Sequence, residues 1–154
     1  MGPLNAALGP VSDEDDAVKK GLIDSYVTAR DELDRALASL APETACGGWS
    51  LYEMAAHIAA WEQYSAEQMW LLARGVPEIP VNVDSMNTAV AARARELPPE
   101  QSMTTYAASR KAFVDSIERL PAAACRLDAV RNHVGMEVGH CMEHAAELRA
   151  LKVG

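Results

Sequence analysis

The chain is poor in several residue types, and each scarcity excludes a class of fold or function. Aromatic residues make up only 5% of its 154 residues, with a single phenylalanine, although hydrophobic residues as a whole reach 49%. A chain rich in alanine and poor in aromatic residues favours helices over sheets. At this length we expect one domain with a hydrophobic core of ordinary size.

Positive charge is also scarce. The 14 Lys and Arg residues face 22 Asp and Glu residues, which gives a formal net charge of −8. Such a surface repels phosphate backbones, so we expect no nucleic-acid partner. The sequence shows no long apolar run and no basic amphipathic segment, so we also expect no association with membranes.

Cysteine is rare and odd in number. Cys46, Cys125 and Cys141 show no paired spacing. This pattern predicts reduced thiols in a cytoplasmic protein rather than a disulfide framework.

The N-terminal stretch "MGPLNAALGPVSDEDD" does not resemble a secretory signal. It has no basic region, and its apolar part is interrupted by Gly9 and Pro10. We therefore expect a cytoplasmic protein in which residues 1–11 form a flexible segment and residues 12–154 form one domain.

Prolines, glycines and capping residues divide the rest of the chain into helices. Ser50 and Glu53 have the S-x-x-E spacing of a capping box, in which each side chain bonds the backbone of the other residue. A short helix is expected over residues 85–97, after a linker over residues 75–84. The four long helices are expected over Ser12 to Leu40, Ser50 to Gly75, Pro98–Pro99 to Pro121, and Asp128 to Lys152. With no strand signal, the sequence predicts an all-α antiparallel four-helix bundle, with a long linker carrying a short helix between the second and third helices.

Histidine is the most informative of the scarce residues, because two of only four lie one helical turn apart. His140 and His144 border the apolar stripe of the last helix, so they are expected to face the groove between helices. His57 shares the inward face of the second helix. Side chains from facing helices converge inside bundles, so these residues can supply three nitrogen ligands to one ion. Three protein ligands leave a fourth position open for water or substrate, as in catalytic zinc sites. Imidazole also suits nickel, iron and copper, so the pattern predicts a divalent metal without fixing its identity.

Ordinary structural roles compete with this interpretation. A single histidine on an apolar face is more often a hydrogen-bonded core residue, and H-x3-H alone is a weak motif. His133 lies two turns below His140, about 10 Å along the axis, which is too far to share an ion. We interpret His133 as structural or as pocket lining. The residues expected to line a pocket beside the histidines are Met54, Trp61, Tyr64, Glu137 and Leu148.

Two segments resemble a known family. "GWSLYEMAAHIAAWEQY" (48–64) is similar to the second helix of DinB/YfiT-like proteins, and "GHCMEHAAELRA" (139–150) resembles their last helix. The resemblance implies that His57, His140 and His144 are metal ligands and that the protein is a homodimer. Within this family, the two segments most resemble the ClbS/DfsB-like and maleylpyruvate-isomerase-type branches. In the isomerase branch one ligand of the last helix is glutamate, whereas here both positions are histidine.

The resemblance leaves three functions open. The first is an enzyme that uses a divalent metal (Zn, Ni or Fe), as a transferase or isomerase with a low-molecular-weight thiol or as a hydrolase, on a small hydrophobic electrophile. The second is a protein that binds or sequesters a small molecule, as in self-resistance, without turnover. The third is an interaction module whose apolar patches serve dimerisation. The sequence identifies no catalytic base and no substrate.

Overall fold

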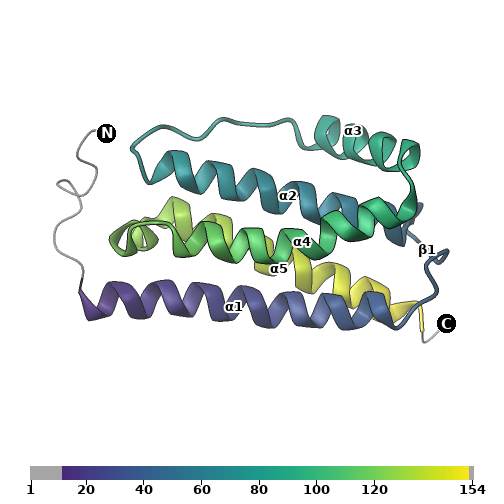
Figure 1. Cartoon of the computed structure of the whole chain (residues 1–154), viewed down its shortest axis with the longest axis horizontal. Helices are drawn as coiled ribbons and strands as arrows, with labels where there is room; N and C mark the ends of the chain where they lie inside the picture. The colour runs from purple at the N-terminus through teal and green to yellow at the C-terminus, as the bar shows by residue number, and fades with distance from the viewer. Residues whose placement is uncertain (1–11, 153–154) are drawn as a thin grey trace.

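The computed structural model describes residues 12–152, which are almost entirely helical. The prediction of a flexible segment over residues 1–11 lies outside the described residues. The four long helices are α1 (Asp13–Ala38), α2 (Leu51–Leu72), α4 (Pro99–Glu118) and α5 (Asp128–Ala150), and they run along the long axis of the molecule (Figure 1). A shorter helix, α3 (Val83–Glu96), and a 3-10 helix, η1 (Ala122–Arg126), complete the helical elements of this part of the chain. Over residues 12–152, no helix has the length and apolar character that crossing a membrane requires.

The helices begin where the capping residues predict. The Ser50 hydroxyl accepts a hydrogen bond from the Glu53 N–H, and the Glu53 carboxylate accepts one from the Ser50 N–H. Ser12 and Asp15 form the same reciprocal box at the start of α1. The cap at Ser50 matters for the site, because it fixes where α2 begins and hence which residues face inward.

The structure is almost entirely helical, as the sequence predicts, but it contains one short hairpin for which the sequence shows no strand signal. Strands β1 (Ala45–Cys46) and β2 (Trp49–Ser50) form a short antiparallel hairpin just before α2. Gly47 and Gly48 make its turn with φ values of 58° and 86°, a left-handed backbone that favours glycine. Two-residue strands are too short to show the alternation by which strands are identified in a sequence.

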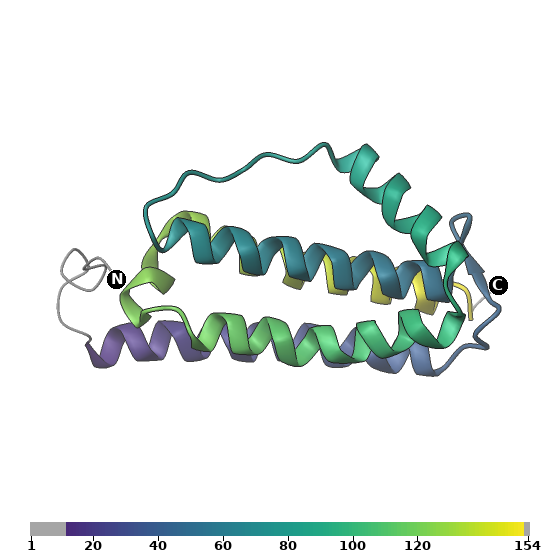
Figure 2. The same ribbon diagram turned by 45° about the horizontal axis from the view of Figure 1, so that its top comes forward.

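The directions of the long helices also differ from the expectation. Consecutive helices α1 and α2 run in opposite directions, as do α4 and α5, but α2 and α4 run in the same direction (Figures 1 and 2). The reason is the linker over residues 73–82, which together with α3 carries the chain back along the molecule before α4 begins. The expectation of antiparallel neighbours is therefore wrong for α2 and α4, which pack against each other.

The core lies between these helices. It is built mainly from aliphatic side chains, together with the rings of Tyr26 and Phe113, which pack in a tilted arrangement with centroids 4.5 Å apart. The closest packing joins α1 with α5 and α2 with α4, and α2 also packs on α5. The seam between α2 and α5 is the one on which the candidate site lies.

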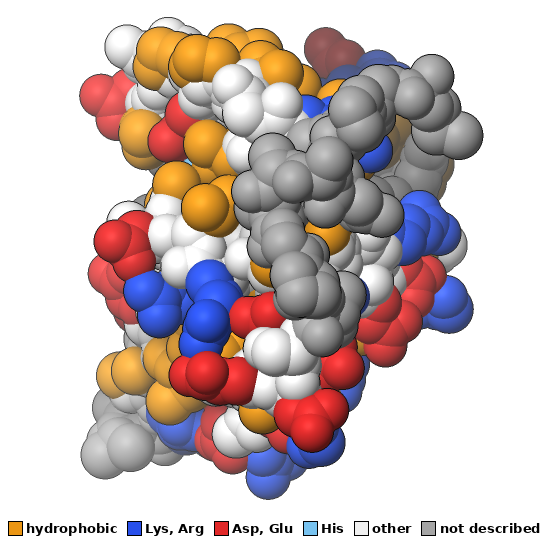
Figure 3. Space-filling model, turned by 90° about the vertical axis from the view of Figure 1, so that its left-hand side faces the viewer, with side chains coloured by type: hydrophobic (Ala, Val, Ile, Leu, Met, Phe, Trp, Pro, Cys, Tyr) orange, Lys and Arg blue, Asp and Glu red, His pale blue; other side chains and the backbone are white. Residues whose placement is uncertain are grey.

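One end of the molecule carries mixed charge and an apolar edge. Seen from the end of the molecule, acidic and basic side chains alternate over the lower half, and hydrophobic side chains gather along the top (Figure 3). The linker between α2 and α3 runs along this top edge, where Val76, Ile79 and Val81 are exposed. All three cysteines are free, and Cys125 and Cys141 are buried, which agrees with the expected absence of a disulfide among them.

Candidate metal centre

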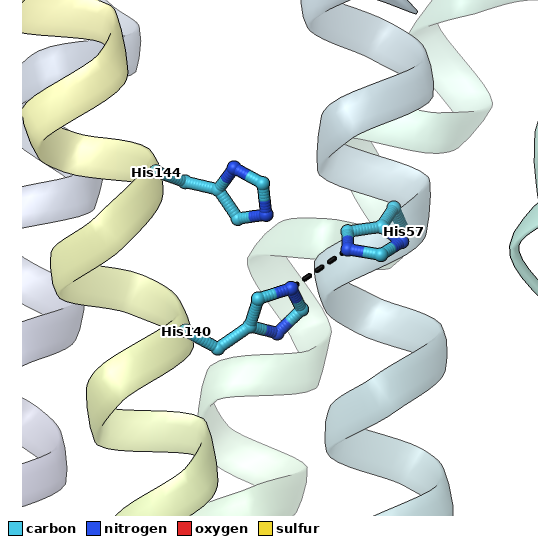
Figure 4. Close-up of side chains that lie close together, drawn as sticks. All are labelled: His57, His140 and His144. Carbon is cyan, nitrogen blue, oxygen red and sulfur yellow. Dashed lines mark hydrogen bonds between the residues drawn. The ribbon is translucent and has the colours of Figure 1, made fainter. Parts of the chain in front are cut away.

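The structure brings together the three histidines that the sequence singles out. His57 comes from α2, and His140 and His144 come from successive turns of α5, so that the three rings point toward one another across the seam (Figure 4). Each ring offers one nitrogen, and these nitrogens all lie within 4.8 Å of one another. The Nε2 atoms of His57 and His140 are 2.7 Å apart, so one of them donates a hydrogen bond to the other. A cluster of this kind could hold a metal ion.

Aromatic residues enclose the ring of His57. This residue is only 6% exposed, and the ring of Trp49 packs on it with centroids 4.6 Å apart. Trp61, one turn further along α2, presents its edge at 6.4 Å. The Trp61 Nε1–H donates to the Asn87 side chain, which ties α3 to this wall. The hairpin and α3 therefore exclude water from one side of the cluster.

The partners of the Nδ1 atoms affect whether the cluster suits a metal, because they determine which nitrogen of each ring carries a proton. Glu147 lies 2.7 Å from His144 Nδ1, and Glu137 lies 3.6 Å from His140 Nδ1. A carboxylate beside Nδ1 favours a proton on that nitrogen and leaves the Nε2 lone pair free to face inward. Over residues 12–152, His57 Nδ1 has no hydrogen-bond partner. The three imidazoles could therefore hold a metal ion, and the donor set fits a divalent one.

Burial keeps the imidazoles of His57 and His144 neutral. Removal from water, together with the neighbouring charges of His140 and His144, lowers the pKa of His57 to about 3. Burial also lowers the pKa of His144, although the bond to Glu147 opposes the shift. Metal ligation requires unprotonated imidazole, so both rings are in the competent form at neutral pH.

The predicted pocket residues take different positions. Met54 and Leu148 are buried in the hydrophobic core, and Trp61 lies beside His57. The hydroxyl of Tyr64 donates to the backbone carbonyl of Ile79, and its ring lies 6.0 Å from that of His133. Whether these side chains line a substrate pocket stays a prediction.

Glu137 and His133 lie on the same inner face of α5, one and two turns below His140 respectively. His133 is outside the three-histidine cluster, as its distance along the helix predicts, and it contacts Ser65 and Glu78 instead. Glu137 is fully buried rather than solvated.

Sequence reasoning assigned no site role to several residues that the structure places around the rings. They are Trp49, Ser65, Asn87 and Glu147. Only Glu147 carries a signal in the sequence, because it follows His144 by three residues and so lies on the same face of the helix. The others come from separate elements, and their contacts depend on how those elements pack.

Two cavities lie on other seams. One, of about 850 Å³, is lined by α2 and α4, and Trp70, which is 52% exposed, stands at its edge. Another, of about 870 Å³, lies mainly between α1 and α4. The walls of the first cavity are mostly apolar, and its lining residues include neither Met54 nor Trp61.

Comparisons of the chain with protein-family models, with curated proteins and with solved structures give no match. The relation to DinB/YfiT-like proteins that two segments of the sequence suggest stays a prediction.

Proposed function

We propose that the protein is a divalent-metal-dependent enzyme with a four-helix bundle of the DinB-like type. The observation that carries this proposal is the convergence of three imidazole nitrogens, from two helices, within 4.8 Å of one another. Three nitrogen ligands are the number that catalytic zinc sites use, with one position left for water or substrate. Zinc, nickel and iron all accept such ligands. A divalent ion at this site supplies a Lewis acid that makes water or a thiol a nucleophile near neutral pH.

The residues around the cluster support this chemistry. Trp49 and Trp61 exclude water from the side of His57, which strengthens electrostatic interactions inside the site. Glu147 holds the Nδ1 proton of His144 and so keeps its other nitrogen available. We infer a small hydrophobic electrophile as substrate, because Trp49 and Trp61 form an apolar wall beside His57.

A thiol in the reaction would come from outside the chain. Cys141 is fully buried, and its burial raises the thiol pKa. Burial likewise raises the pKa of Cys125 and of the more accessible Cys46. A raised pKa leaves little thiolate at neutral pH, so none of the three is an activated nucleophile. This is why we propose a low-molecular-weight thiol as cosubstrate for the transferase or isomerase alternative, with water in that place for a hydrolase.

Metal content of the purified protein tests the site directly. We expect one divalent ion per chain, and His140→Ala should lose most of it, because two imidazoles do not hold an open-site ion tightly. His133→Ala is the matched control on the same helix and should retain the ion, since His133 contacts Ser65 and Glu78 instead. Elemental analysis after exhaustive dialysis measures the stoichiometry. If His140→Ala and His133→Ala both match the wild type, the three-histidine site is wrong.

A binding or sequestering protein is the second candidate, and the cavity between α2 and α4 favours it. This cavity of about 850 Å³ has mostly apolar walls and suits a hydrophobic compound without any metal chemistry. A panel of electrophiles, tested with several small thiols and with water alone, separates the two candidates when metal-loaded and chelated proteins are compared. Turnover that depends on metal supports the enzyme. Tight binding without turnover by the loaded protein supports sequestration.

A further inference from the structure

The carboxylate of Glu137 is buried in an unusual setting. The residue is 0% exposed, and its Oε2 atom has no hydrogen-bond partner over residues 12–152. Burying a carboxylate oxygen without a partner costs about 1–3 kcal/mol or more. The bond that Glu137 does make is at the other oxygen, Oε1, which accepts a hydrogen bond of 2.7 Å from the Ser65 hydroxyl. The hydrogen bonds of Glu137 thus leave the position of Oε2 unexplained.

The unpartnered oxygen faces a ring of the candidate metal centre. Oε2 lies 3.6 Å from His140 Nδ1, on the side of the ring opposite the nitrogen that approaches His57. Glu137 precedes His140 by three residues on α5, so both side chains lie on one face of the helix. The separation is longer than a hydrogen bond, and the two atoms need to approach by only about 0.7 Å to form one.

A chain of polar contacts holds Glu137 in this place. Ser65, on α2, bonds the carboxylate from across the seam, and His133 Nδ1 lies 3.3 Å from the Ser65 hydroxyl. His133 Nε2 in turn lies 3.0 Å from Glu78 in the linker between α2 and α3. The carboxylate is therefore fixed from two helices, and the linker supports the outer end of the chain of contacts.

We propose that Glu137 is a positioning residue for His140. Its Oε2 accepts the Nδ1 proton, and this fixes the tautomer of His140 whose Nε2 lone pair faces His57 and His144. Ser65 orients Glu137 for this contact. The inference deepens the proposed function and rests on it for its purpose, because a fixed tautomer matters only to a ring that binds a ligand. The tautomer itself is a property of the metal-free protein.

The matching contact at His144 shows why Glu137 is the more effective partner. Glu147 also lies beside an Nδ1 atom, but its side chain is 47% exposed, whereas the Glu137 side chain is fully buried. Water screens the exposed carboxylate and competes for its lone pairs, whereas the buried one acts in a medium of low dielectric constant. Loss of Glu137 should therefore affect its histidine more than loss of Glu147.

The tautomer can be read directly by NMR. In protein labelled with 15N-histidine and freed of metal at about pH 8, long-range 1H–15N correlations distinguish Nδ1–H from Nε2–H imidazole. We expect the Nδ1–H form for His140 in the wild type and a shift toward the Nε2–H form in Glu137→Met. Glu143→Met is the matched control, since Glu143 is an exposed glutamate three residues beyond His140 on the same helix. It should leave the spectrum of His140 unchanged.

Metal affinity provides the second readout. A Co²⁺ titration followed by absorption should show affinity weaker by about 10- to 100-fold in Glu137→Met. Glu143→Met should bind as the wild type does, and Glu137→Gln, which keeps an acceptor oxygen, should recover part of the loss. If circular dichroism shows that Glu137→Met does not fold, Ser65→Ala takes its place, with the same shift in tautomer and a smaller loss of affinity.

The outcomes separate this inference from the proposed function. A wild type that binds no Co²⁺ overturns the metal site, while the tautomer of His140 still reports on Glu137. A wild type that binds Co²⁺ alongside a Glu137→Met (or Ser65→Ala) variant with unchanged tautomer and affinity overturns the positioning role and leaves the metal site intact.

Discussion

His57 links the candidate site to the stability of the fold. Its pKa is lowered to about 3 by burial and by the neighbouring histidines, whereas an unfolded chain protonates histidine near pH 6.5. Between these values the unfolded state binds more protons than the folded state, so stability rises with pH and is lost as the pH falls. The buried imidazole is thus a source of acid sensitivity.

We expect the metal-free protein to lose stability below about pH 6.5, by up to about 1.4 kcal/mol per pH unit from His57 alone. His144, whose pKa is also lowered, should steepen the loss. Urea unfolding in the presence of a chelator at several pH values between 7 and 4 measures this slope. His57→Asn should flatten the curve over the same range, and an equally steep curve in that variant would contradict the assignment.

Arg30 is the other residue whose surroundings predict a large effect on the stability of the fold. Its side chain is 0% exposed, it donates a 2.6 Å hydrogen bond to the Tyr106 carbonyl, and it lies 3.5 Å from Glu62, a carboxylate that is also buried. Arg30→Met should lower the free energy of unfolding by about 3–5 kcal/mol, because it leaves the Glu62 charge unpaired in the core. The double variant Arg30→Met/Glu62→Met should recover most of this loss in denaturant unfolding. Losses that simply add would show that the pair is not coupled.

At the scale of single elements, the cap of α2 connects the local sequence to the site. Ser50→Ala removes the acceptor of the Glu53 N–H and should cost about 1 kcal/mol of stability. Ser12→Ala removes the equivalent bond at the start of α1, so the two variants should lose similar stability in thermal or urea unfolding. Only Ser50→Ala should also weaken metal binding, because its helix carries His57. Equal metal affinities in the two variants would show that the first turn of α2 does not position the ring.

The elements show what periodicity and capping can predict. The four long helices and the capping box of Ser50 and Glu53 follow from residues close together in sequence, and the structure confirms where these helices begin. The hairpin over residues 45–50 was not predicted, because two-residue strands are too short to show an alternation of apolar and polar residues. The common direction of α2 and α4 was not predicted for a different reason. Periodicity indicates which face of a helix is buried, but it does not indicate in which direction the next helix runs.

The same distinction applies to the site. His57, His140 and His144 lie on inward helix faces, so their spacing along the helices was enough to predict one candidate cluster. Trp49 and Ser65 were not assigned to the site from the sequence, because their roles depend on where a loop folds and on how α2 is rotated against α5. Such contacts between elements leave no mark on the periodicity of either one.

At the scale of the whole molecule, the homodimer suggested by the resemblance stays a prediction. We expect light scattering to give twice the 16.6 kDa chain mass over a range of concentrations. The exposed Trp70 beside an apolar cavity is the kind of surface that association covers. The mass of a single chain at every concentration, with or without metal, would contradict the prediction.

The position of the cluster on the seam between α2 and α5 also determines when it can form during synthesis and folding. His57 and His140 are 83 residues apart, and the chain between them includes the linker, α3, α4 and η1. Contacts between such distant segments form late, because closing a long loop costs entropy before the contact is made. During synthesis His57 is therefore made long before the two histidines of α5, and the cluster is complete only after α5 has been released and has docked. A chain truncated before α5 would keep one imidazole of the three, so capture of an ion is expected to be the last step in the maturation of this protein.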